Sequence, residues 1–166
     1  MRIVKSRDTM IIEKFQPSQA KAVSDLIRRG LLEINSQYYP LEFITSLVDH
    51  FSPAQIRENA LTQHIFVARE GEAVVGTAGL ANFGSTEQPN YYGVAVFVLP
   101  EYTGRGIGRQ LMAAVEARAR ELGAQKLTVR AAMGAQEFYV KLGYRFQGGK
   151  NELDEKGYYI LEKELK

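Results

Sequence analysis

The sequence predicts one α/β domain over residues 1–166, with a mixed central sheet of about six to seven strands and helices on both faces. Short apolar segments typical of strands predict the sheet, and apolar residues that recur every three or four positions predict the helices. The two kinds of segment follow one another along the chain. With 166 residues, 45% of them hydrophobic, the chain can bury a full core, and without cysteine it cannot form a disulfide.

The N-terminal half contains a strand, three helices and a hairpin of two strands, expected over residues 10–15, about 18–30, 41–49, from 53 onward, 65–68 and 73–80. Gly30 predicts an interruption or end of the first helix. Ser52 and Pro53 predict the start of the short third helix, because serine caps a helix and proline fits its first turn. The turn Glu70-Gly71-Glu72 joins the two strands of the hairpin.

The C-terminal half contains a strand, a long helix, a strand, a short helix and two final strands, expected over residues 91–99, 104–122, 126–130, 135–142, 144–147 and 158–162. The strand before Pro100 lacks alternation, which predicts burial on both faces. Leaving aside the short helix at Pro53, the order of elements is β-α-α-β-β-β-α-β-α-β-β. Hairpins followed by two β-α-β crossovers predict the mixed sheet.

The segment after this strand, Thr103-Gly-Arg-Gly-Ile-Gly-Arg109, is the most informative part of the sequence. Glycines at 104, 106 and 108 leave the backbone N–H groups at the start of the long helix bare, and the helix dipole adds partial positive charge. Arg105 and Arg109 add full charges. This pattern predicts a phosphate-binding site, and the alternative is a tight turn between strand and helix. Neither the mononucleotide loop nor the dinucleotide fingerprint fits the spacing.

Two motifs resemble those of the GCN5-related N-acetyltransferases (GNAT). The first is Val96-Phe-Val-Leu-Pro100 followed by Thr103-Gly-Arg-Gly-Ile-Gly108, and the second is Ala135 followed by Phe138-Tyr139 and Gly143-Tyr144. The resemblance implies a single acetyltransferase domain with a GNAT-like, mostly antiparallel sheet. It also implies an N-acetyltransferase that moves an acetyl group from acetyl-coenzyme A to a primary amine by direct attack.

The resemblance also implies which residues bind acetyl-coenzyme A, the co-substrate: Val96, Phe97, Val98, Thr103, Gly104, Arg105, Gly106, Ile107, Gly108 and Arg109. Val96 and Val98 supply main-chain bonds to the pantetheine arm, as in strand addition. The chain departs from the family pattern at two positions. Thr103 stands where a Gln or Arg is usual, and Gly134 stands where an Asn often precedes the alanine.

Tyr139 matches the tyrosine that the family places beside the departing thiolate, so the resemblance implies that it is the general acid. Its alternative is a core aromatic, although Phe138 is the better core residue. The general base stays open among five residues of acidic, imidazole or phenol type: Asp49, His50, Glu87, Tyr91 and Tyr92. The two histidines have no partners at metal-ligand spacing, so no metal site is expected.

The acceptor amine is expected beside residues 30–52, because the family builds the acceptor side from the first helices. The substrate-binding candidates are Tyr38, Tyr39, Asp49 and Tyr91, which combine aromatic and acidic groups suited to a small amine. A small-molecule amine is favoured. The alternatives are a protein lysine or N-terminal acetyltransferase, and a non-catalytic acyl-coenzyme A sensor.

Charge and hydropathy limit partners and location. A net charge of +2 argues against nucleic acid, and the apolar run from Val94 to Leu99 is too short to span a membrane. Charged Arg2, Lys5, Arg7 and Asp8 do not fit the apolar region of a signal peptide, so a cytoplasmic location is expected. The sequence does not determine the oligomeric state, although homodimers are common in families like this one.

Overall fold

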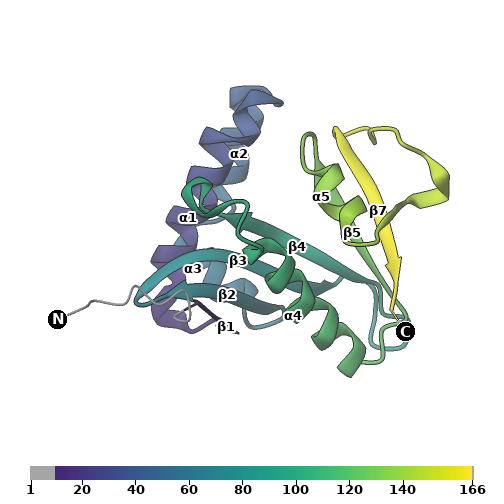
Figure 1. Cartoon of the computed structure of the whole chain (residues 1–166), viewed down its shortest axis with the longest axis horizontal. Helices are drawn as coiled ribbons and strands as arrows, with labels where there is room; N and C mark the ends of the chain where they lie inside the picture. Colours follow the sequence, from purple (N-terminus) through teal and green to yellow (C-terminus); the bar gives the residue numbers. More distant parts are fainter. Residues whose placement is uncertain (1–9, 166) are drawn as a thin grey trace.

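The computed structural model describes residues 10–165, so the four charged N-terminal residues named above lie outside the described residues. The helices and strands follow the expected order (Figure 1), with three helices before the second strand. They are β1 (Met10–Lys14), α1 (Ala20–Glu33), α2 (Leu41–Asp49), α3 (Pro53–Asn59), β2 (His64–Glu70), β3 (Ala73–Asn82), β4 (Tyr91–Val98), α4 (Ile107–Glu121), β5 (Lys126–Ala132), α5 (Gln136–Lys141), β6 (Arg145–Phe146) and β7 (Tyr158–Glu164). At α3, Ser52 Oγ accepts a hydrogen bond from the Gln55 N–H at 3.1 Å, as expected of its cap.

The seven strands form one sheet in the order β1-β2-β3-β4-β5-β7-β6. Neighbouring strands are antiparallel except β4 and β5, which are parallel and joined by α4. The predicted mixed, mostly antiparallel sheet is therefore confirmed. Strand β6 is only two residues long and pairs with β7, which lies between it and β5.

The parallel seam between β4 and β5 is short. It contains two register pairs, Tyr92 with Thr128 and Gly93 with Val129, after which the strands diverge (Figure 1). Gly93 allows this close approach, because a Cβ on it would lie 3.2 Å from the Val129 side chain. Beyond the seam, β4 is bulged against β3, and Ala95 has a φ of 51°. The bulge and the divergence together open the second half of β4.

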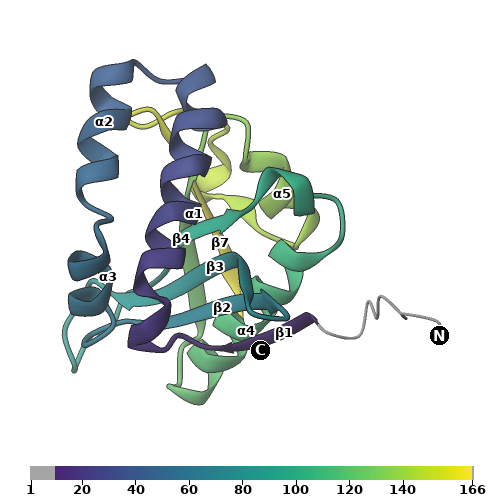
Figure 2. The ribbon, with the colours of Figure 1, turned by 90° about the vertical axis from the view of Figure 1, so that its left-hand side faces the viewer.

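Helices cover both faces of the sheet (Figure 2). Helices α1, α2 and α3 pack on one face, over a core that includes Val23, Ile27 and Ile44. Helix α4 packs on the other face through residues such as Leu111 and Val115. None of the helices within residues 10–165 combines the length and the apolar character that crossing a membrane requires.

Two details of the strand-to-helix segment differ from the prediction. Strand β4 was expected to be buried on both faces, but Gly93 is its only buried residue among those described, because the strand diverges from β5. Helix α4 was expected to begin at Gly104, but it begins at Ile107 after a short 3-10 turn at Pro100–Tyr102. Gly104 and Gly106 therefore precede the helix instead of forming its first turn.

Gly30 does not interrupt or end α1, which continues to Glu33. It is buried against Phe97 of β4, and a methyl group on its Cα would lie 2.5 Å from Phe97 Cδ1. The glycine is thus required by a contact between helix and sheet, which local sequence does not reveal.

We expect Gly30→Ala to destabilise the protein by about 1–3 kcal/mol, although the same change in a free helix stabilises by about 1 kcal/mol. The added methyl group overlaps the Phe97 ring, so one of the two must shift. Urea unfolding measures the change. Phe97→Leu replaces the ring with a smaller side chain. Combined with Gly30→Ala, it should recover part of the lost stability. A single variant as stable as the original protein would contradict the role given to this contact.

Candidate functional site

Two pockets lie on opposite faces of the sheet and both reach β4. The turn pocket, of about 430 Å³, is lined by Val96, Val98, Tyr102, Thr103, Gly104, Gly106, Ile107, Gly108, Arg109, Ala135, Phe138 and Tyr139. The helix-side pocket, of about 450 Å³, is lined by Val23, Ile27, Asp49, His50, Phe51, Gln55, Ile56, Asn59, Gln63, Ile65, Thr77, Gly79, Phe83, Val94 and Ala95. Ala95 faces one pocket and Val96 the other, so the two approach each other at the bulge of β4.

The glycine segment forms the floor of the turn pocket. Gly104 and Gly106 have φ values of 78° and 79°, a left-handed conformation that glycine adopts at little cost. Gly106 is the N-cap of α4, and the first turn of that helix carries no acidic residue. The N–H groups of this first turn have no partners within the helix, so they and the helix dipole favour an anion.

Eight of the ten residues predicted to bind the coenzyme line this pocket, and Phe97 and Arg105 do not. Phe97 points to the opposite face of the sheet, against Gly30. The Arg105 guanidinium instead stacks on the Tyr102 ring, with 4.7 Å between its carbon and the ring centroid. The Arg109 guanidinium curls back over the turn, with Nη2 3.4 Å from where a Gly106 Cβ would lie.

The prediction omitted three residues that line the turn pocket, Tyr102, Ala135 and Phe138. Ala135 and Phe138 belong to the second motif, which was the available signal. Phe138 packs on the core, as predicted, and also covers α4, since a Cβ on Gly108 would lie 3.0 Å from its ring. For Tyr102 the sequence carried no signal beyond its position beside the glycines.

The backbone of β4 offers unpaired groups beyond the seam. The Leu99 N–H donates to the Val75 carbonyl at 2.9 Å, so the alternate residue Phe97 also faces β3. By the same alternation, the N–H and C=O groups of Val96 and Val98 face the space from which β5 has diverged. They can pair with an extended ligand.

Tyr139 lies at the inner end of the turn pocket. Its side chain is 7% exposed, and its ring packs edge-on against Phe138 and Tyr144, at centroid distances of 5.0 and 5.7 Å. Burial raises the pKa of the Tyr139 phenol well above its ordinary value, because the charged form is poorly solvated there. The phenol therefore keeps its proton at neutral pH.

A buried polar cluster holds Tyr144, one of the two aromatic residues that pack on Tyr139. The Tyr144 hydroxyl donates to Glu116 Oε2 at 2.8 Å, and Lys163 Nζ donates to Glu116 Oε1 at 2.9 Å. Glu116 is only 6% exposed, so these partners compensate for its lost hydration. The cluster joins α4, β7 and Tyr144, and thus holds the ring on which Tyr139 packs.

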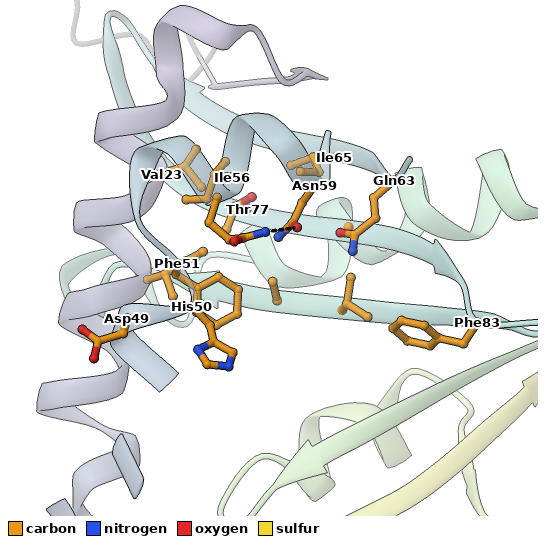
Figure 3. A pocket seen from close by; sticks show the side chains of 15 residues that line it. Val23, Asp49, His50, Phe51, Ile56, Asn59, Gln63, Ile65, Thr77 and Phe83 are labelled. Atoms are coloured by element: carbon orange, nitrogen blue, oxygen red, sulfur yellow. Dashed lines mark hydrogen bonds between the residues drawn. The ribbon is translucent and has the colours of Figure 1, made fainter. Parts of the chain in front are cut away.

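The helix-side pocket has apolar walls and one charged end (Figure 3). Asp49 and His50, from the end of α2, lie together at one end, and Phe83 lies at the other. Gln55 Nε2 donates to Asn59 Oδ1 at 2.9 Å, forming an amide pair on α3. Within residues 10–165 the structure brings together no set of three His, Asp or Glu side chains that could hold a metal ion.

Of the four predicted acceptor residues, only Asp49 lines the helix-side pocket. Tyr91 packs on the α4 face of the sheet, and Tyr38 and Tyr39 lie above Gly134 and Gly157. Among the candidates for the base, His50 joins Asp49 at the pocket, whereas Glu87 is exposed in the loop before β4. Tyr92 packs edge-on to Phe83, with 5.2 Å between ring centroids.

Tyr39 connects the segment between α1 and α2 to the segments that follow β5 and precede β7. Its hydroxyl accepts from the Met133 N–H at 2.9 Å and donates to the Gly157 carbonyl, and its ring stacks on Tyr158. The adjacent Tyr38 ring covers Gly134, where an added Cβ would lie 2.8 Å from Cζ. These contacts hold the α1–α2 connection against the segments that flank α5 and β7.

We expect Tyr39→Phe to lower the free energy of unfolding by about 1–3 kcal/mol, because the half-buried Met133 N–H and Gly157 carbonyl lose their partner. Chemical denaturation followed by circular dichroism measures the loss. Tyr38→Phe is the matched control, since the Tyr38 side chain is exposed and its hydroxyl, unlike that of Tyr39, makes no hydrogen bond to another described residue. Equal stability changes in the two variants would refute the connecting role of the Tyr39 hydroxyl.

Comparison with known proteins gives a family match. The model of the acetyltransferase (GNAT) family matches residues 28–144. The PaiA N-acetyltransferase from Thermoplasma acidophilum in complex with coenzyme A is 18% identical, with a TM-score of 0.78 over 93% of this chain and 98% of that one. A GCN5-related N-acetyltransferase structure from Rhodopseudomonas palustris is 23% identical, with a TM-score of 0.76 over 99% and 100%.

A third solved structure, yncA from Salmonella typhimurium with its cofactor acetyl-CoA, is 16% identical, with a TM-score of 0.69 over 95% of this chain and 94% of that one. No curated protein matches the sequence. At these identities the solved structures show a shared fold, while the family match covers most of the chain, including the glycine segment and Tyr139.

Proposed function

Because the chain belongs to the acetyltransferase (GNAT) family, we propose that it transfers an acetyl group from acetyl-coenzyme A to the primary amine of a small molecule. Two of the similar structures hold coenzyme A or acetyl-CoA. The observation that carries the proposal is the pair of pockets that reach β4 from opposite faces at Ala95 and Val96. One pocket suits the coenzyme and the other suits the acceptor.

The turn pocket fits the coenzyme. No side chain fills the space at Gly104, where an added Cβ would have nothing within 4 Å, so a phosphate can approach the backbone. The N–H groups at the start of α4 and the Arg109 guanidinium hold the diphosphate in this proposal. Val96 and Val98 pair through their backbone with the pantetheine arm, and Thr103, whose hydroxyl donates to the Pro100 carbonyl, contributes backbone only.

Tyr139 is the proposed general acid. The coenzyme supplies an acetyl thioester, whose cleavage by an amine leaves a thiolate that needs a proton. The Tyr139 phenol lies in the turn pocket and keeps its proton because burial raises its pKa, so it can donate that proton. Phe138 and Tyr144 hold its ring from two sides.

Asp49 and His50 are proposed to receive the acceptor. An amine arrives mostly as an ammonium ion, which the Asp49 carboxylate attracts, and it must lose a proton before it attacks. His50 follows Asp49 in the chain and lines the same pocket, and its imidazole is the group suited to accept that proton. We also propose that the reaction takes place in the cytoplasm and that the enzyme is a homodimer. Light scattering tests the oligomeric state.

The test is release of free thiol from acetyl-coenzyme A, followed with a thiol reagent over a panel of amines, amino acids, polyamines and peptides. Acceptor-dependent release with small amines, together with an acetylated product in the mass spectrum, is the expected result. Preference for peptides would instead indicate a protein acetyltransferase. Saturable coenzyme binding without any acceptor-dependent release would indicate a sensor and refute the proposal.

A further inference from the structure

The side chains around the helix-side pocket limit the charge of its ligand. Of the fifteen described residues that line it, Asp49 is the one carboxylate, and none is Lys or Arg. The other polar side chains are neutral amides and a hydroxyl, apart from His50 at the Asp49 end. The Thr77 hydroxyl already donates to the Phe66 carbonyl at 3.0 Å.

These charges disfavour two common kinds of amine. An amino acid carries a carboxylate, which would enter the pocket without a cationic partner and lose its hydration. A polyamine carries further ammonium groups, for which the pocket has no second carboxylate. One ammonium group can pair with Asp49.

The apolar and amide side chains of the pocket indicate what the rest of the ligand, apart from its amine, is made of. Val23, Ile27, Ile56 and Ile65 form apolar walls, which gain from contact with hydrocarbon or an aromatic ring. On α3, the hydrogen bond from Gln55 to Asn59 leaves the Asn59 amide donors and the Gln55 oxygen free for a neutral polar group. A volume of about 450 Å³ suits a small molecule.

We infer that the acceptor is a primary monoamine with an apolar or aromatic body and no carboxylate, held with its amine at Asp49 and His50. This inference rests on the proposed acetyltransferase function and names the substrate class of that site. It distinguishes acceptors that differ by a single charged group, so matched pairs of compounds can test it.

The experiment compares kcat/KM for thiol release with two such pairs. Phenylethylamine and phenylalanine differ by a carboxylate, and hexylamine and 1,6-diaminohexane differ by a second amine. We expect the first member of each pair to be better by about tenfold or more. Equal or better rates with phenylalanine or the diamine would overturn the inference and leave the acetyltransferase function standing.

Asn59→Asp places a second carboxylate in the pocket without changing its shape. We expect it to shift the ratio of kcat/KM for 1,6-diaminohexane over hexylamine upward by about tenfold. Glu58→Gln, an exposed neighbour on α3 that does not line the pocket, is the matched control and should leave the ratio unchanged. No shift in the Asn59 variant would show that the acceptor binds elsewhere and overturn the inference.

Failure of the proposed function has a different signature. Calorimetry would then show coenzyme A binding, while no amine or peptide in either panel would accelerate thiol release. The inference falls together with the function in that case. Release with the diamine or the amino acid but not with the monoamines refutes the inference alone.

Discussion

Gly104→Asp should weaken coenzyme A binding by tenfold or more relative to Gly104→Asn. Both side chains tolerate the left-handed conformation that Gly104 adopts, with φ at 78°, and neither meets an atom within 4 Å of its Cβ. They differ in one negative charge beside the proposed diphosphate site. At a separation of about 5 Å and an effective dielectric constant of about 40, each pair of unit charges costs about 1.7 kcal/mol.

Isothermal titration calorimetry with coenzyme A measures this difference. The asparagine variant controls for shape and backbone strain, so the ratio of the two dissociation constants reports charge. The ratio should fall as salt is raised from 0.05 to 0.5 M, values that correspond to screening lengths of about 14 and 4 Å. Equal affinities for the two variants at low salt would place the diphosphate away from the glycine turn.

Tyr139→Phe should lower kcat by about two orders of magnitude, as expected from loss of a general acid, and leave the affinity for coenzyme A nearly unchanged. The substitution removes one oxygen and keeps the ring that packs on Phe138 and Tyr144. Steady-state kinetics and calorimetry on the same preparation separate the two effects. Phe138→Leu, which alters the pocket wall and keeps the Tyr139 hydroxyl, is the companion variant and should act mainly on coenzyme affinity.

The pH profile checks the protonation state of Tyr139. Its pKa in the folded protein is raised above the unfolded value of about 10, so the proton stays in place between pH 6 and 9. Any stability linked to this proton is kept below pH 10 and lost only as the pH rises through the folded pKa. Rate should therefore increase with pH as the amine and base lose protons. Tyr139→Phe should lower the profile without moving its midpoint, and an alkaline limb below pH 9 that disappears in this variant would contradict the assignment.

The succession of elements was predictable because it depends on local periodicity. The hairpin at Gly71 and the cap at Ser52 each rest on residues a few positions apart, and both were confirmed. The motif residues of the turn pocket were predictable for the same reason. Eight of the ten residues predicted to bind the coenzyme lie together in this pocket, because the chain passes directly from β4 through the glycines into α4.

Contacts between distant residues were not predictable. The Tyr39 hydroxyl meets Gly157, 118 positions away, so its role as a link between the α1–α2 connection and the segment before β7 had no local signal. Gly30 was predicted to interrupt or end a helix, whereas in the structure it lies inside α1 and packs against Phe97. The helix-side pocket draws on α1, α2, α3 and three strands, and of its lining the sequence predicted only Asp49 and His50 as site residues.

The Tyr38 ring over Gly134 has an evolutionary consequence. Gly134 has a φ of 90°, and any side chain there would meet the Tyr38 ring, so an asparagine at 134 requires this exposed ring to move aside or to be replaced by a smaller side chain. The two sites should therefore covary among descendants of this chain, with a bulky aromatic paired with glycine.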